Sequence, residues 1–181
     1  MLDLLPSIVA PAQLLANTRL AATTPPGDFA EVGVFYGGSA EMLYRIAQLQ
    51  RRTLHLFDTF TGTPCAVPGL DKHEIGDEFA APGAEEHIRA QLPEARLYVG
   101  VYPETHPKRL PPLAFVHCDC DQYDSYIAVI DNLWPLVVPG GILLFDDYPY
   151  LAGAKRAVEE RFAVADLKLC HQRNYVVKSR G

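Results

Sequence analysis

Short apolar runs alternate with segments of helical periodicity along most of the chain. The strand-like runs cover residues 29–34, 53–57, 97–99, 113–118 and 142–145. The segments with helical spacing cover residues 12–22, 41–50, 126–136 and 154–162. Because the strand-like runs are apolar on both faces, they are typical of a parallel sheet that helices cover on both sides.

Three regions depart from this alternation. Residues 1–28 form a helical lead that ends at Pro25-Pro26-Gly27. Residues 61–84 are rich in proline, glycine and acidic side chains, and we expect them to form a lid or a substrate loop. The runs at 166–171 and 175–178, separated by Gln172-Arg173-Asn174, predict an antiparallel hairpin at the end of the sheet.

The composition favours one α/β domain over residues 1–181. A chain of 181 residues with 49% hydrophobic content can bury one sizeable core. The net charge of −6 and the scattered lysines and arginines argue against nucleic acid as a partner. The opening residues lack a basic region and a long apolar run, so we expect no signal peptide, no membrane span and a cytoplasmic location. The four cysteines are expected to be reduced thiols.

A glycine turn follows the first strand-like run. It lies within the segment EVGVFYGGS, from Glu31 to Ser39, where Gly33 and Gly37 stand four residues apart. Glycines at this spacing let the backbone approach a ligand, and the following helix offers free N–H groups. The segment is neither a GxGxxG pattern nor a P-loop. A purely structural turn between strand and helix has the same spacing, so both interpretations stay open.

Asp58 ends the second strand-like run, roughly 20 residues beyond the glycine turn, where a carboxylate accepts hydrogen bonds from ribose hydroxyls. Asp58 and Thr59 would equally cap a following segment. Together with the glycine turn, the ribose interpretation is favoured and indicates an adenosyl cofactor.

Acidic residues follow two neighbouring strand-like runs. Asp119, Asp121 and Asp124 come directly after residues 113–118. Asp124 or Ser125 is expected to be the N-cap of the next helix, whereas Asp119 and Asp121 have no such structural role.

Asp146 and Asp147 follow the run at 142–145. Adjacent carboxylates repel each other unless a cation or a proton lies between them, and oxygen ligands suit Mg²⁺. The alternative is a solvated pair that caps the next helix. His117 and the cysteines beside it match no ordinary zinc spacing, so zinc is disfavoured.

Seven ordered motifs between residues 29 and 162 resemble a known family. They read EVGVFYGGSAE, LHLFDTFTGTP, GDEF, GVYPET, FVHCDCDQYDS, VVPGGILLFDDY and GAKRAVEE. In this order they resemble the macrocin O-methyltransferase-like group of the class I S-adenosylmethionine-dependent methyltransferases.

The resemblance implies a Rossmann-like, mostly parallel seven-stranded sheet with a C-terminal antiparallel hairpin and helices on both faces. It implies S-adenosylmethionine over the glycine turn, and Mg²⁺ held by Asp119, Asp146 and Asp147, with Asp119 as general base. The acceptor would be a hydroxyl of a small molecule, a sugar or a catechol-like ring, and a homodimer is plausible for the family. The residues that would bind the cofactor are Glu31, Gly33, Tyr36, Gly37, Ser39, Asp58, Thr59, Gly100 and Asp119.

Two other functions compete with methyl transfer. A nicotinamide-dependent oxidoreductase is disfavoured by the missing GxGxxG pattern. A non-catalytic adenosyl-binding protein of the same fold is possible in principle, because a fold does not determine a function, but the acidic pairs argue against it. Within the metal site, Asp121 competes with Asp146 and Asp147 as a ligand because it lies two residues from Asp119.

Overall fold

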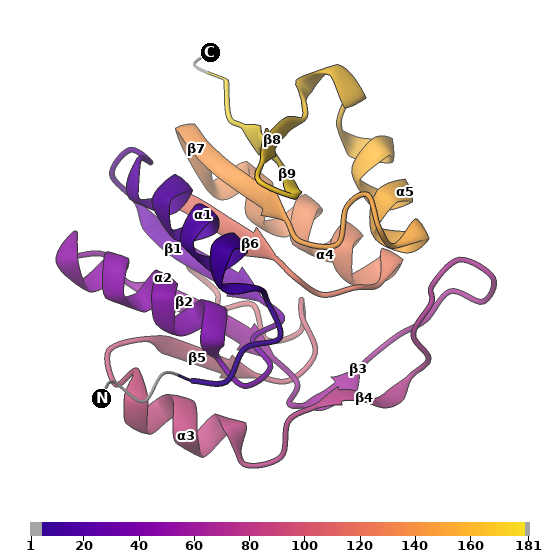
Figure 1. Cartoon of the computed structure of the whole chain (residues 1–181), viewed down its shortest axis with the longest axis horizontal. Helices are drawn as coiled ribbons and strands as arrows, with labels where there is room; N and C mark the ends of the chain where they lie inside the picture. The colour runs from indigo at the N-terminus through magenta and orange to yellow at the C-terminus, as the bar shows by residue number, and fades with distance from the viewer. Residues whose placement is uncertain (1–4, 180–181) are drawn as a thin grey trace.

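A seven-stranded sheet forms the centre of the structure, a computed structural model that describes residues 5–179 (Figure 1). The strand order is β5-β2-β1-β6-β7-β9-β8. The neighbouring strands from β5 to β7 run parallel, and β9 pairs antiparallel with both β7 and β8. The strands are β1 (Asp28–Val32), β2 (Leu54–Asp58), β5 (Arg96–Val99), β6 (Leu113–Cys118), β7 (Val137–Phe145), β8 (Lys168–Cys170) and β9 (Arg173–Val177). The predicted fold class, including the C-terminal hairpin, is confirmed.

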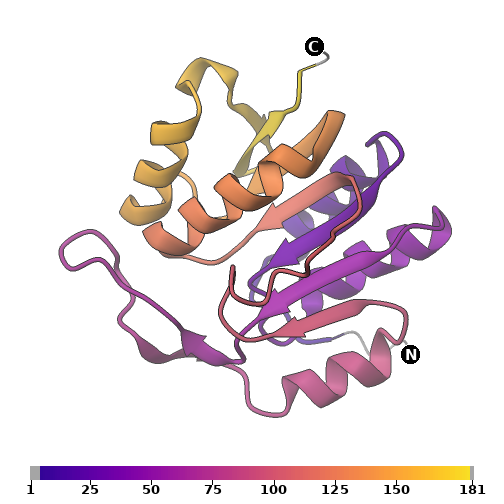
Figure 2. The ribbon, with the colours of Figure 1, turned by 180° about the vertical axis from the view of Figure 1, so that it is seen from behind.

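Helices cover both faces of this sheet (Figures 1 and 2). One layer holds α1 (Pro11–Ala22), α2 (Gly38–Leu49) and α3 (Ala84–Gln91), and the other holds α4 (Tyr123–Leu133) and α5 (Ala152–Arg161). Two 3₁₀ turns, η1 (Trp134–Leu136) and η2 (Val164–Asp166), complete the helical elements. Phe29 and Phe115 are buried under the first layer, and Phe57 and Phe145 under the second. The two layers explain why the strands are apolar on both faces.

The predicted helical lead at residues 1–28 contains α1, close to the predicted range of 12–22, and its residues 1–4 lie outside the described part of the chain. Buried Gln13 joins α1 to the C-terminal hairpin, because its Oε1 accepts a hydrogen bond from the N–H of Gln172 at 3.2 Å. No helix within residues 5–179 has the length and apolar character that crossing a membrane requires. All four cysteines are free thiols, as predicted.

Strand β7 begins at Val137, ahead of the predicted start at Ile142, and so includes Pro139, Gly140 and Gly141. Val137 pairs with Leu113, but Ile142 pairs with Phe115, and the register therefore shifts between these positions. Gly140 adopts a φ of +84° in the irregular stretch and donates its N–H to the carbonyl of Lys178 at 2.8 Å. The proline and glycines thus form a bulge inside the strand.

Helix α4 begins at Tyr123, before the predicted start at Tyr126, and Asp124 and Ser125 are not its N-cap. Gln122 occupies the N-cap position and makes no side-chain capping bond. A carboxylate from a distant segment acts instead, because Asp71 Oδ1 accepts a hydrogen bond from the N–H of Tyr123 at 2.9 Å. Local sequence spacing cannot reveal such a cap.

Residues 61–84 are more ordered than the predicted loop. Strands β3 (Thr61–Thr63) and β4 (Gly76–Ala80) pair antiparallel into a ribbon that projects from the main sheet (Figure 1). The chain between them lies against the start of α4, where Gln122 Nε2 donates to the carbonyl of His73 at 3.1 Å. Helix α3 follows at Ala84 and was not predicted.

The end of β1 lies directly against the end of β6. Gly33, just beyond β1, has a φ of +89°, and a Cβ atom placed there would stand 1.6 Å from the backbone oxygen of Asp119. Only glycine allows this approach.

We therefore expect Gly33→Ala to lower the free energy of unfolding by on the order of 3 kcal/mol or more, because backbone strain and a backbone clash add together. Urea denaturation followed by circular dichroism measures the loss. Gly83→Ala is the matched control, since its φ is +78° and no atom lies within 4 Å of the added Cβ. Equal losses in both variants would show that the contact with Asp119 does not limit stability.

Candidate functional site

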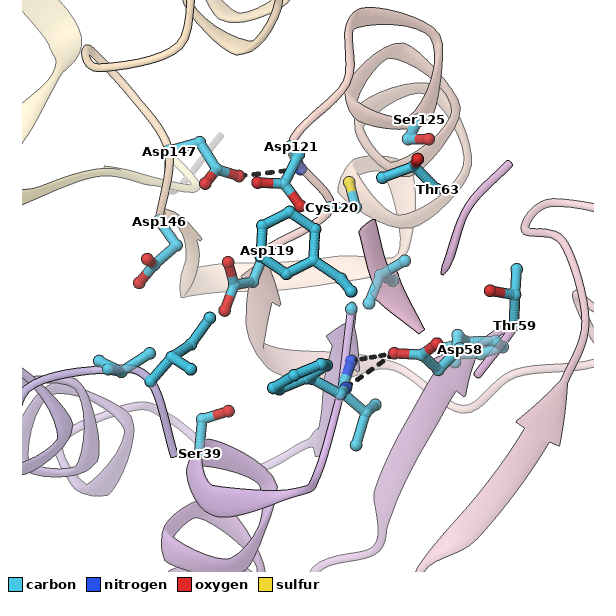
Figure 3. A pocket seen from close by; sticks show the side chains of 18 of the residues that line it. Ser39, Asp58, Thr59, Thr63, Asp119, Cys120, Asp121, Ser125, Asp146 and Asp147 are labelled. Carbon is cyan, nitrogen blue, oxygen red and sulfur yellow. Dashed lines mark hydrogen bonds between the residues drawn. The ribbon is translucent and has the colours of Figure 1, made fainter. Parts of the chain in front are cut away.

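The strand order reverses between β1 and β6. Strands β2 and β5 follow on the β1 side of this point, and β7, β9 and β8 follow on the β6 side. Ligands of open α/β sheets bind at the carboxyl ends of the strands beside such a reversal. A cavity of about 430 Å³ lies at this place. Its walls come from the strand ends, from residues 6–10 ahead of α1 and from the β3–β4 ribbon (Figure 3).

Most of the predicted site residues line this cavity. They are Gly33, Ser39, Asp58, Thr59, Gly100, Asp119, Asp146 and Asp147. The lining does not include three residues that we expected to bind the cofactor, namely Glu31, Tyr36 and Gly37. The ring of Tyr36 packs edge-on against Phe35, and Gly37 serves as the N-cap of α2 with a φ of +91°.

Asp58 holds the glycine turn against the end of β2. Its Oδ2 accepts the N–H groups of Val34 at 2.5 Å and Phe35 at 2.8 Å (Figure 3), and its Oδ1 accepts the N–H of Phe60 at 2.7 Å. The carboxylate therefore has a structural role while it also lines the cavity. The two roles that the sequence left open for Asp58 do not exclude each other.

An aromatic pair that the sequence did not indicate joins the glycine turn to the ribbon. Phe35 from the turn and Phe79 from β4 both line the cavity and meet edge to face with ring centroids 6.1 Å apart. Both have positive φ values, +53° and +60°, which are uncommon for bulky residues and occur often at ligand sites. Gly62, Thr63 and Pro64 of the ribbon also line the cavity.

The opposite end of the cavity is acidic (Figure 3). Asp119, Asp146 and His117 each present one ligand-type atom, and these atoms lie within 4.8 Å of one another. No oxygen of Asp147 belongs to this group. Its Oδ2 accepts the N–H of Asp121 at 3.0 Å and the hydroxyl of Tyr126 at 2.9 Å. The structure thus brings together two of the three expected metal ligands and turns one oxygen of the third away.

His117 is buried between two carboxylates. Its Nδ1 lies 2.8 Å from Glu31 Oε1 and its Nε2 lies 3.3 Å from Asp146 Oδ1. Burial alone would lower the pKa of His117, but the hydrogen bonds to Asp146 and Glu31 outweigh it and raise this pKa well above its usual value. A doubly protonated ring has no lone pair for a metal. Glu31, expected at the cofactor, is instead the buried partner of His117.

Arg173 is a site residue that the sequence analysis missed. Strand β9 begins at Arg173, so this residue does not belong to the predicted turn. Its Nε lies 2.9 Å from Asp146 Oδ2 as an ion pair, with the N–H not directed at that oxygen. Burial alone would raise the pKa of Asp146, but the hydrogen bond from His117 and the charges of His117 and Arg173 lower it. Asp146 is therefore ionised.

The remaining acids have weaker partners: His73 Nε2 lies 3.9 Å from Asp121 Oδ1, and neither Asp119 nor Asp147 has an ion pair among the described residues. Burial and the neighbouring charges of Asp146 and Asp147 raise the pKa of Asp119 well above its usual value. Burial and the charges of Asp121 and Asp146 raise the pKa of Asp147 to about 7. Burial and the charges of Asp146 and Glu78 raise the pKa of Asp121 to about 6. The cavity thus holds more carboxylates than cations, and a positive ligand would relieve their repulsion.

The chain is similar to several curated O-methyltransferases. It is 30% identical to demethyldecarbamoylnovobiocin O-methyltransferase of Streptomyces niveus, over 78% of this chain and 61% of that protein. It is 28% identical to 8-demethyl-8-(2,3-dimethoxy-alpha-L-rhamnosyl)-tetracenomycin-C 4'-O-methyltransferase of Streptomyces olivaceus, with the same coverage of both chains. The chain therefore spans about three fifths of the length of these curated relatives.

Solved structures share the fold. The O-methyltransferase NovP superposes with a TM-score of 0.77 at 25% identity, over 96% of this chain and 82% of that one. The calicheamicin methyltransferase CalS11 superposes with a TM-score of 0.75 at 21% identity, over 91% of this chain and 76% of that one. Residues 15–169 match the sequence profile of the family described as Macrocin-O-methyltransferase (TylF). The resemblance inferred from the seven motifs is confirmed, and the chain belongs to the macrocin-O-methyltransferase family.

Proposed function

We propose that the chain is an S-adenosylmethionine-dependent O-methyltransferase that methylates a hydroxyl of a sugar or another small natural product. The observation that carries the proposal is the place of Asp119. This residue lies in the cavity at the strand-order reversal, between the glycine turn and the acidic pair. The names of the relatives, which are O-methyltransferases of demethyldecarbamoylnovobiocin and of a rhamnosyl-bearing tetracenomycin, support this class of acceptor.

The residues at the glycine-turn end fit an adenosyl group. Asp58 presents a carboxylate at the end of β2, Gly33 presents bare backbone, and Phe35 and Phe79 supply apolar walls. S-adenosylmethionine, when bound, supplies a methyl group on a positively charged sulfonium. The acidic cavity favours that charge.

The acidic end fits a hard divalent cation, and we propose Mg²⁺. None of the residues 5–179 donates a hydrogen bond to the Asp119 carboxylate or to Asp147 Oδ1, so both retain free lone pairs. Asp146 is ionised and lies within reach of Asp119. A bound Mg²⁺ would supply the positive charge that lowers the pKa of an acceptor hydroxyl. Asp119 and Asp146 are the expected ligands, with Asp147 Oδ1 or Asp121 as the third.

Asp119 would accept the proton of the acceptor hydroxyl. In the metal-free protein burial and the charges of Asp146 and Asp147 raise its pKa well above the usual value, and a bound cation would lower this pKa again. The neighbouring Asp146 stays ionised because His117 and Arg173 hold it, so the site keeps a fixed negative charge beside the base. The oligomeric state of the chain stays a prediction.

The cofactor assignment is tested by isothermal titration calorimetry. We expect S-adenosylhomocysteine to bind and NAD not to bind. Asp58→Asn should weaken binding at least about tenfold, since hydrogen bonds to a charged group are lost. Asp28→Asn is the matched control, because Asp28 also accepts a backbone N–H, that of Thr53, but lies at the opposite end of the sheet. Equal affinity of the Asp58 variant and the wild type would refute the cofactor placement.

The chemistry is tested by methyl transfer to a panel of hydroxylated natural products. We expect a chelator to abolish turnover and Mg²⁺ to restore it. Asp119→Asn should lower kcat by about 10²-fold to 10⁴-fold, the usual loss for a general base, while S-adenosylhomocysteine still binds. Full turnover in excess chelator would exclude the metal. Binding of the cofactor product without turnover of any acceptor would favour a non-catalytic adenosyl-binding protein.

The pKa of about 7 for Asp147 predicts how pH affects the metal-free protein. The folded state binds this proton more tightly than the unfolded chain does, so stability falls as the pH rises from about 4 to about 7. With a chelator present, the free energy of unfolding of the wild type should fall by about 2–3 kcal/mol more than that of Asp147→Asn when the pH rises from 5 to 8. Urea unfolding at both pH values measures this. An equal change in the free energy of unfolding for the wild type and the variant between the two pH values would contradict the raised pKa of Asp147.

A further inference from the structure

The hydroxyl of Tyr126 joins the ends of the two acid-bearing strands. Tyr126 lies near the start of α4 and is fully buried. Its hydroxyl lies 3.0 Å from the carbonyl of Cys118 at the end of β6 and 2.9 Å from Asp147 Oδ2 beyond β7, and its one proton is shared between them. The hydroxyl oxygen also accepts the N–H of Asp147 at 3.1 Å.

These contacts hold both the backbone and the side chain of Asp147. The N–H of Asp121 provides a further hydrogen bond to the same carboxylate oxygen, Oδ2. Two donors on one oxygen fix the rotation of the carboxylate and leave Oδ1 as the oxygen without a hydrogen bond among the described residues. Asp147 lines the cavity. Tyr126 and the N–H of Asp121 together therefore determine which oxygen of Asp147 is free.

Packing does not explain the hydroxyl. The ring of Tyr126 lies in the core beside Phe145, with centroids 6.3 Å apart, and a phenylalanine would fill the same space. A buried hydroxyl is costly unless it is hydrogen-bonded. The hydroxyl does not touch Asp119 in any hydrogen bond of the described residues, so its effect on the site passes through Asp147.

We propose that Tyr126 is a positioning residue that orients the Asp147 carboxylate for the divalent cation. The inference rests on the proposed function, because it assigns Asp147 to the cation site. Loss of the hydroxyl would leave the N–H of Asp147 without its partner, and the carboxylate would keep only the hydrogen bond from the N–H of Asp121 among the described residues.

The test is Mn²⁺ binding followed by electron paramagnetic resonance, which needs no turnover. Tyr126→Phe should weaken Mn²⁺ binding by about 10-fold to 100-fold, the usual loss when a residue that orients a metal ligand is removed. Binding of S-adenosylhomocysteine should stay unchanged, which also shows that the variant is folded. Tyr123→Phe is the matched control, because it removes a hydroxyl of the same helix that bonds an exposed carboxylate, Glu160. This control should bind Mn²⁺ as the wild type does.

A double-mutant cycle separates positioning from a general structural loss. In the Asp147→Asn background, Tyr126→Phe should cause no further loss of Mn²⁺ affinity. In turnover, excess Mg²⁺ should restore the kcat of Tyr126→Phe while the KM for S-adenosylmethionine stays constant.

Wild-type Mn²⁺ affinity in Tyr126→Phe, or the same loss with and without Asp147, would overturn the inference. A Tyr126→Phe chain that neither folds nor binds S-adenosylhomocysteine would also overturn it, since the hydroxyl would then serve stability. Failure of the wild type itself to bind Mn²⁺ would overturn the proposed cation site, and that result is visible before any variant is compared.

Discussion

The parallel pairing of β1 with β6 is the constraint on which the site depends. The N–H of Asp119 bonds the carbonyl of Val32 at 2.9 Å, and Gly33 then passes so close to Asp119 that no side chain fits. The same strand, β1, leads into the glycine turn that Asp58 holds. One backbone contact therefore places the proposed cofactor end and the proposed base side by side. A wider spacing at Gly33 would separate the proposed cofactor end of the cavity from Asp119, the proposed base.

The second constraint is the cost of burying carboxylates. The charge of Asp146 is balanced by His117 and Arg173, which offset the cost of its burial. Asp119 and Asp147 have no such cationic partners among the described residues, and burial beside other carboxylates raises their pKa values. This uneven distribution is itself informative, because an acid that the protein does not neutralise is available to a ligand. The same imbalance that weakens the metal-free protein would strengthen cation binding, since the bound cation replaces the missing charge.

Local patterns in the sequence predicted the strands, their parallel arrangement and the acidic strand ends. Asp119 was found because a residue that follows an apolar parallel strand must lie at the ligand-binding edge. Arg173 and Tyr126 were not recognised as site residues, because their roles depend on which strands are neighbours and on register. Arg173 reaches Asp146 only through the pairing of β9 with β7, in which Phe145 lies opposite Asn174. The ribbon was missed because β3 and β4 are short and separated by a loop without periodicity.

Helix α4 connects the parts of the site that the sequence keeps apart. Its first turn receives Asp71 from the loop between β3 and β4, and its N-cap, Gln122, is fully buried and bonds the same loop at His73. One turn later, Tyr126 holds Asp147. The ribbon supplies Thr63 and its neighbours to the cavity wall, so this wall and the carboxylate of the proposed cation site both contact the start of the same helix. A substitution in the ribbon that shifts this turn would therefore alter binding at the proposed cation site, although no ribbon residue is a proposed cation ligand.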